Sequence, residues 1–198
     1  MLFAVFEPIQ VLPRIRLAPG FSLVDQSGET LTSDDGRGGV TLYNFAPVDC
    51  GECGAMFETM REIRDRVAEE VDLGDLRFRL VTIALDASDP ASLTAAAEAS
   101  GADGDRWRWA GAHERRRREI VGDGFRTRYD AGDPSDFDQA FVIVDGKGLI
   151  RGEYRYATLA PLADKLTRHI GLMAAEVRGA EGAAALLYEA AHMFLCYP

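Results

Sequence analysis

A pair of cysteines, Cys50 and Cys53, lies where a predicted strand meets a predicted helix, and this pair constrains the fold most. Residues 40–45 (VTLYNF) are rich in β-branched and aromatic residues, which favours a buried strand. After about Gly54, apolar residues recur at intervals of three and four, which is typical of an amphipathic helix: Met56, Met60, Ile63, Val67 and Val71. Cysteines three positions apart at a helix start have sulfurs within disulfide reach, so the pattern predicts redox chemistry or binding of a soft metal ion.

The surroundings of Cys50 act on its thiol in opposite directions. Unpaired backbone N–H groups at the start of a helix favour a thiolate and lower a cysteine pKa. Asp49 and Glu52 disfavour a further negative charge nearby. We therefore expect the pKa of Cys50 to lie moderately below the value for free cysteine, and the pair to be reducing rather than strongly oxidising.

Two other interpretations of the pair remain open. A structural zinc site needs four ligands, and the sequence has neither a second pair with this spacing nor a nearby pair of histidines. The second is a chance pair without chemistry. Two thiolates suit Cu(I), which accepts few, soft ligands, so Cys50 and Cys53 are candidate copper ligands as well as candidate catalytic residues.

Composition bounds the function further. With 198 residues, of which 47% are hydrophobic, the chain can bury a core as one domain or one domain plus an extension. The net charge of −10 disfavours binding to nucleic acid or to an anionic membrane surface, because both carry negative charge. The three histidines, His113, His169 and His192, nearly exclude a mechanism that needs several of them.

The order of predicted elements is typical of a mixed α/β fold. Two short strands come first, then strand, helix, strand and helix, then a short strand and a helix at 112–121. A hairpin follows, with strands at 140–144 and 149–156, and then a helix at 159–172. This order predicts an α/β sandwich, and the cysteine pair at the end of the first long strand makes it thioredoxin-like.

The chain resembles the SCO/SenC family of thioredoxin-fold proteins between about Phe21 and Leu172. The resemblance is carried by the order and spacing of five segments: FSLVDQSGETLT, VTLYNFAPVDCGECGAMFETMREI, LRFRLVTIALDASDPASL, WRWAGAHERRRREIVGDGF and FVIVDGKGLIRGEY. It implies a domain at 21–174, preceded by an extended lead-in at 1–20 and followed by a helical extension at 175–198. It also implies a membrane-anchored, extracytoplasmic protein that delivers copper to, or reduces the cysteines of, the CuA site of cytochrome c oxidase.

Two positions differ from the family pattern. The family has three residues between its cysteines and a proline after the second, whereas here Gly51 and Glu52 intervene and Gly54 follows. The family's copper-binding histidine lies shortly before the closing hairpin, where this chain has Phe137-Asp138-Gln139. A Cu(I) site here would therefore consist of the two cysteines alone or be completed by a partner.

Three functions follow as hypotheses. The first is electron transport by thiol–disulfide exchange, in which Cys50 attacks a partner disulfide and Cys53 resolves the mixed disulfide. Its partner would be a protein with a thiol or disulfide, such as a cytochrome oxidase subunit, and it requires no cofactor. The second is a Cu(I) chaperone that uses the same cysteines as ligands. The third is a non-catalytic interaction module that keeps only the fold. The predicted location is extracytoplasmic and membrane-associated, with the cytoplasm as the alternative.

The two ends of the chain each allow more than one interpretation. The start (MLFAVF) is either a packed arm or the remnant of a membrane anchor, and no stretch reaches the roughly 18–20 apolar residues of a membrane span. Residues 181–194 are predicted to be helical, with His192 and Cys196 four positions apart. These two residues form half of a conceivable metal site. The alternatives are a packed helix with a buried thiol and a helix that mediates dimerisation.

Overall fold

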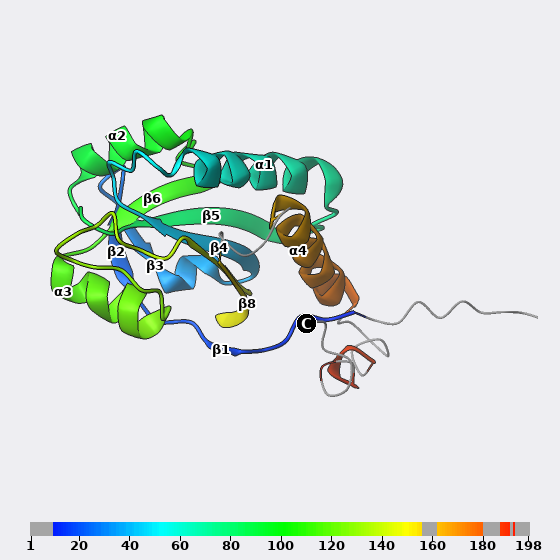
Figure 1. Cartoon of the computed structure of the whole chain (residues 1–198). Helices are drawn as coiled ribbons and strands as arrows, with labels where there is room; N and C mark the ends of the chain where they lie inside the picture. Colours follow the sequence, from blue (N-terminus) through cyan, green and yellow to red (C-terminus); the bar gives the residue numbers. More distant parts are fainter. Residues whose placement is uncertain (1–9, 156–161, 180–186, 191, 193–198) are drawn as a thin grey trace, which may run out of the picture.

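The computed structural model describes residues 10–155, 162–179, 187–190 and 192. In this part of the chain, one sheet of eight strands has the order β1-β8-β7-β4-β5-β6-β2-β3 (Figure 1). The strands are β1 (Arg16–Leu17), β2 (Ser22–Asp25), β3 (Thr30–Thr32), β4 (Gly39–Ala46), β5 (Arg77–Ala84), β6 (Trp107–Gly111), β7 (Ala140–Val144) and β8 (Leu149–Arg155). The helices are α1 (Gly54–Glu70), α2 (Pro90–Ser100), α3 (Glu114–Arg117) and α4 (Leu162–Gly179), with a 3-10 turn at Ser33–Gly36 and a π-helix at Arg118–Gly124.

Strand β4 is the centre of the sheet. It runs parallel to β5 and antiparallel to β7, and all eight of its residues are buried. Helices α1 and α2 connect β4 to β5 and β5 to β6, which makes two parallel β-α-β units. The carboxyl ends of β4, β5 and β6 therefore meet at one edge of the sheet, and the predicted hairpin β7–β8 completes the other half.

Apolar side chains fill both faces of the sheet. Helices α1, α2 and α4 lie over one face (Figure 1), where the core contains Leu42 and Ala46 of β4. Tyr43 and Phe45 point to the opposite face, where Phe125 packs against both rings. This alternation follows from the period of two in a strand, and it assigns each residue of β4 to a face.

The start and end of α2 are encoded in its sequence. The Asp89 side chain accepts a hydrogen bond from the backbone N–H of Ser92 at 2.9 Å, and Pro90 occupies the first turn. Hydrogen bonding from the backbone N–H and the side chain of Ser92 lowers the pKa of Asp89. Gly101 ends the helix with a φ of 81°, a left-handed conformation that glycine adopts without steric cost.

The described part of the lead-in belongs to the packed structure. Val11 and Leu12 are buried, and β1 pairs with β8. The buried guanidinium of Arg151 donates to the backbone oxygens of Leu12 at 2.7 Å and Pro13 at 3.1 Å. At the other end, α4 continues without interruption through residues 174 and 175. The predicted limits of the central domain, 21–174, therefore fall within continuous structure on both sides, and they stay a prediction.

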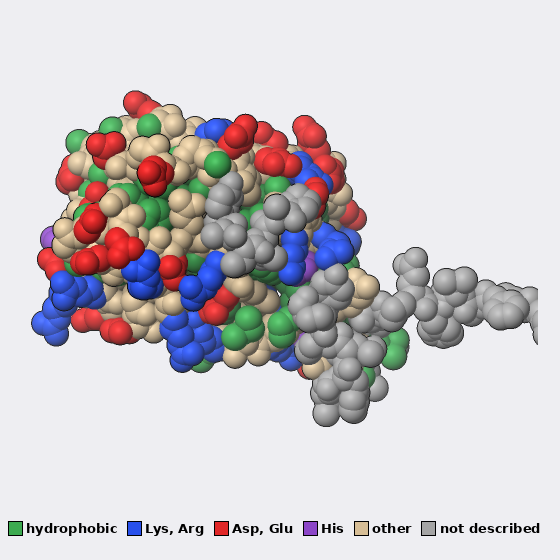
Figure 2. Space-filling model, in the orientation of Figure 1, with side chains coloured by type: hydrophobic (Ala, Val, Ile, Leu, Met, Phe, Trp, Pro, Cys, Tyr) green, Lys and Arg blue, Asp and Glu red, His purple; other side chains and the backbone are tan. Residues whose placement is uncertain are grey.

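The region after β6 differs from its predicted form. The helix predicted at 112–121 is one turn of α3 followed by the π-helix, and Arg126 after it adopts a left-handed φ of 57°. Three of the four consecutive arginines pair with Glu114 or Glu119. Acidic and basic side chains are interspersed over the face of the molecule that Figure 2 shows. Arg117 instead is buried, and it donates to the backbone oxygen of Ala112. The rotation per residue changes from α to π geometry. Residues that would share a face at α-helical spacing therefore do not share one here.

Candidate functional site

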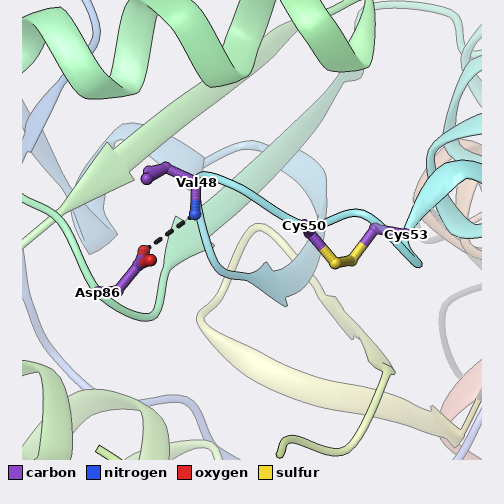
Figure 3. Close-up of a disulfide and its surroundings, with 4 residues drawn as sticks. All are labelled: Val48, Cys50, Cys53 and Asp86. Atoms are coloured by element: carbon purple, nitrogen blue, oxygen red, sulfur yellow. Dashed lines mark hydrogen bonds between the residues drawn. A yellow bond between two sulfur atoms is a disulfide. The ribbon is translucent and has the colours of Figure 1, made fainter. Parts of the chain in front are cut away.

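Cys50 and Cys53 lie in the loop that follows β4, and their sulfurs form a disulfide (Figure 3). Their Cα atoms are 5.4 Å apart. Cys53 is the N-cap residue of α1, and its backbone oxygen accepts a hydrogen bond from the N–H of Phe57 at 2.9 Å. The strand-to-helix junction predicted from the sequence is therefore present, and it brings the two sulfurs together.

The two cysteines differ in exposure. Cys53 is 0% exposed and belongs to the core cluster beneath α1, together with Met56 and Phe57. Cys50 is half-buried and packs at the edge of this cluster, and Gly51 and Glu52 between the cysteines are exposed. Thiol–disulfide exchange requires access to a sulfur, and Cys50 is the more accessible cysteine of the pair.

Asp86 supports the cysteine loop from the neighbouring strand. Its side-chain Oδ1 accepts a hydrogen bond from the backbone N–H of Val48 at 2.9 Å (Figure 3). Asp86 follows β5, and because β5 is parallel to β4 both strands end at this edge. Asp86 was not predicted from the sequence to be part of the site. The signal that could have found it is its place at the carboxyl end of the strand next to the one that carries the cysteines.

In the described residues, no group of three or more histidines, cysteines, aspartates and glutamates is arranged to hold a metal ion. At the position that corresponds to the family's copper-binding histidine, Phe137 is partly buried against both core clusters. The carboxylate of Asp138 pairs with Arg155 at 2.7 Å and with Arg128 at 3.5 Å. Neither residue supplies a soft ligand, so Cys50 and Cys53 are the sulfur ligands that this region offers.

The histidines of the described chain have other surroundings. His113 is exposed. His169 lies in α4, where its Nδ1 is 2.5 Å from the hydroxyl of Tyr154. Burial, helped by the charges of Lys165 and Arg168, lowers the pKa of His169 to about 4, so the ring is neutral near pH 7.

His192 forms a polar contact with α4. Its Nε2 is 2.8 Å from Oε1 of Glu176. Cys196, the other half of the conceivable metal site, lies outside the described residues. The described structure therefore brings the predicted cysteines together and gives His192 a carboxylate partner. Within this same part of the chain, no helix is long and apolar enough to cross a membrane.

The model of the SCO1/SenC protein family matches residues 11–171. A comparison with curated proteins gives no match. The SCO1/SenC match begins inside the predicted lead-in and ends within α4, so it includes every strand of the sheet.

Solved structures share the fold at low sequence identity. BsSco, described as a member of the Sco family of cytochrome c oxidase assembly proteins with a disulfide switch, has 18% identity and a TM-score of 0.70 over 83% of this chain and 98% of its own. A SCO1/SenC family lipoprotein from Bacillus anthracis has 19% identity and a TM-score of 0.69 over 80% and 95%. Yeast Sco1 with copper bound has 15% identity and a TM-score of 0.64 over 87% and 98%. These matches confirm the predicted thioredoxin-like α/β fold.

Proposed function

The chain belongs to the SCO1/SenC family, and from this membership we propose that it takes part in the assembly of cytochrome c oxidase as an electron-transport protein. We propose that it acts by thiol–disulfide exchange through Cys50 and Cys53. The observation that carries the proposal is the Cys50–Cys53 disulfide at the start of α1, with one cysteine accessible and the other fully buried. The similar BsSco structure is described by a disulfide switch, which supports the same chemistry here.

The exchange balances in two steps. The thiolate of reduced Cys50 attacks one sulfur of a partner disulfide, a mixed disulfide forms, and the other partner sulfur leaves as a thiolate. Cys53 then loses its proton and attacks the sulfur of Cys50, which releases the second partner sulfur. The chain ends as the Cys50–Cys53 disulfide, and the partner gains two electrons and two protons as a dithiol.

The proposed partner is a cytochrome oxidase subunit whose CuA cysteines must be reduced before they bind copper. The proposed location is extracytoplasmic and membrane-associated, and the similarity to a lipoprotein of this family supports it. The side of the pair with the half-buried Cys50 and the exposed Gly51 and Glu52 is the side that such a partner would contact.

The first prediction tests the exchange itself. Fully reduced protein is expected to convert oxidised glutathione to two molecules of reduced glutathione per chain as the Cys50–Cys53 disulfide forms. In a Cys196→Ser background, which itself retains the rate, replacing both cysteines of the pair by serine is expected to lower the rate to that of buffer. If the double serine variant reacts as fast as the unmodified protein, the proposal is wrong and the interaction module becomes the better hypothesis. With an oxidase subunit as substrate, the corresponding readout is copper uptake after reduction.

Copper delivery is a second candidate, with Cu(I) as the cargo. The copper-bound structure of yeast Sco1 favours it, and so does the presence of two soft thiols at one site in this chain. The second prediction is that fully reduced protein binds one Cu(I) and that the double serine variant binds none at this site. Titration against a competing chelator measures both. An absence of cysteine-dependent binding at micromolar free Cu(I) rejects delivery and leaves exchange as the function.

A further inference from the structure

The cysteine loop, residues 47–52, is joined to the rest of the described structure by one hydrogen bond outside the pair itself. The parallel ladder between β4 and β5 ends at Ala46. Pro47 follows and has no N–H to donate. The next N–H of the chain, that of Val48, donates to Oδ1 of Asp86 at 2.9 Å (Figure 3). A side-chain carboxylate thus takes the place that a backbone oxygen of β5 would have in a longer ladder.

This hydrogen bond is the main directional restraint on the loop once the disulfide is reduced. The other hydrogen bond of the loop within the described residues runs from the N–H of Cys53 to the backbone oxygen of Cys50 at 3.4 Å, and it only closes a turn within the pair. The two residues between the cysteines are exposed, and the side chains of Val48 and Cys50 pack partly buried against the core. Apolar contacts of this kind are not directional. The position of Cys50 in the reduced protein therefore depends on the hydrogen bond from Val48 to Asp86.

Asp86 is itself fixed by its neighbours in the segment between β5 and α2. Gly111, at the end of β6, packs so closely on this segment that a Cβ there would collide with the backbone oxygen of Ala87. Farther along the same segment, the side chain of Asp89 caps α2 through the N–H of Ser92. The segment is therefore a rigid support, from which the carboxylate of Asp86 holds the loop in place.

We infer that Asp86 is a positioning residue that keeps Cys50 close to Cys53 in the reduced protein and thereby favours formation of their disulfide. In exchange with oxidised glutathione, the two thiols of the pair lose two electrons and two protons as the Cys50–Cys53 bond forms, and the glutathione disulfide breaks to give two thiols. The equilibrium constant measures the effective concentration of one cysteine at the other, and a loop that is already held in place closes at a smaller cost in entropy. This inference rests on the proposed exchange function and names a residue that adjusts it.

The test is the equilibrium of Asp86→Ala with glutathione near pH 7, in a Cys196→Ser background, with the oxidised and reduced fractions measured by alkylation. Loss of one hydrogen bond should lower the equilibrium constant for disulfide formation by about three- to tenfold. The pair then becomes more oxidising by about 15 to 30 mV for a two-electron couple. Asp86→Asn removes the charge but keeps a side-chain oxygen for the N–H of Val48, so its constant should stay within about twofold of that of the unmodified protein.

Asp72→Ala is the matched control. Asp72 precedes β5 and so lies at the opposite end of that strand from Asp86, and its exposed carboxylate also accepts a backbone N–H, that of Gly74 at 3.2 Å. The variant removes the same kind of hydrogen bond far from the cysteines, so it should leave the equilibrium constant unchanged.

Amide hydrogen exchange measured by NMR gives a second test on the unmodified protein. Coupling between the hydrogen bond and the disulfide is reciprocal, so a hydrogen bond that favours the disulfide must itself be weakened by reduction. The Val48 amide should therefore exchange several-fold faster in the reduced protein than in the oxidised protein. The Gly74 amide, which donates to Asp72, should exchange at the same rate in both.

The outcomes separate the inference from the function. If unmodified protein shows no reversible couple with glutathione, the proposed function fails and the inference fails with it. If unmodified protein cycles and Asp86→Ala has the same equilibrium constant, the inference about Asp86 is wrong and the function stands. Equal shifts in Asp86→Ala and Asp86→Asn would assign the effect to the lost charge and would also overturn the inference. An equal shift in Asp72→Ala would do the same, because the effect would then come from a general loss of stability.

Discussion

Cys53→Ser protein is expected to stop at a mixed disulfide, whereas Cys50→Ser protein is expected to form almost none. In Cys53→Ser the accessible thiol of Cys50 still attacks a disulfide, but no second thiol of the pair releases the product. In Cys50→Ser the remaining thiol is that of Cys53, which is 0% exposed. Attack then requires local opening of the structure, so we expect the rate to fall by roughly two orders of magnitude or more.

Intact-mass measurement after incubation with oxidised glutathione distinguishes the two variants. The expected result is one added glutathione on Cys53→Ser and a much slower addition to Cys50→Ser. A Cys196→Ser background removes any contribution of the third cysteine. Equal rates of addition to the two variants would show that burial in the oxidised structure does not determine which sulfur reacts first.

Replacing Arg151 by methionine is expected to destabilise the fold by about 3–5 kcal/mol, because it leaves buried carboxylates without their partner. The side chain of Arg151 is 3% exposed. Its guanidinium pairs with Asp145 at 3.0 Å and Glu176 at 2.7 Å, and both carboxylates are nearly buried. Burial raises the pKa of Glu176, but hydrogen bonds from Arg151 and His192 outweigh it and leave that pKa lowered. The carboxylate is therefore ionised near pH 7 and depends on these donors.

Arg128→Met is the matched control for this prediction. Arg128 forms two hydrogen bonds with Asp136 at 2.8 Å, but both side chains are more than half exposed, where water replaces the interaction. Urea unfolding should therefore show a large loss for Arg151→Met and a small one for Arg128→Met. Similar losses would mean that the buried ion pairs do not hold the lead-in to α4. Loss of exchange activity in folded Arg151→Met is not expected, since Arg151 is remote from the cysteine loop.

The site was predictable to the extent that it depends on residues close in sequence. Cys50 and Cys53 are three positions apart, and the apolar periodicity after them fixes the start of α1 to within a residue. The buried run of β4 and the Asp89 cap of α2 are local patterns of the same kind. Each of these features is determined by a few neighbouring side chains, so the sequence alone indicates it.

The rest depends on contacts between distant segments. The hydrogen bond from Val48 to Asp86 joins residues 38 positions apart, and it exists only because β4 and β5 are parallel neighbours. The hydrogen bonds from Trp107 to Thr82 and from Thr82 to Asn44 join three strands, so no pattern within one strand indicates them. Arg117 is buried at the end of α3, directly before a π-helix that no periodicity in the sequence indicates.

The chain enters the described fold at the opposite end of β4 from the cysteines. Arg151 binds Leu12 and Asp145, and Gly146, in the same turn, accepts a hydrogen bond from Gly38 just before β4 begins. Eight strand residues at about 3.3 Å each place Cys50 roughly 25 Å farther along. Any attachment made through the residues before Val11 therefore lies at the end of the domain opposite the cysteine loop. A large partner can then dock on Cys50 without competing for space with whatever holds the chain.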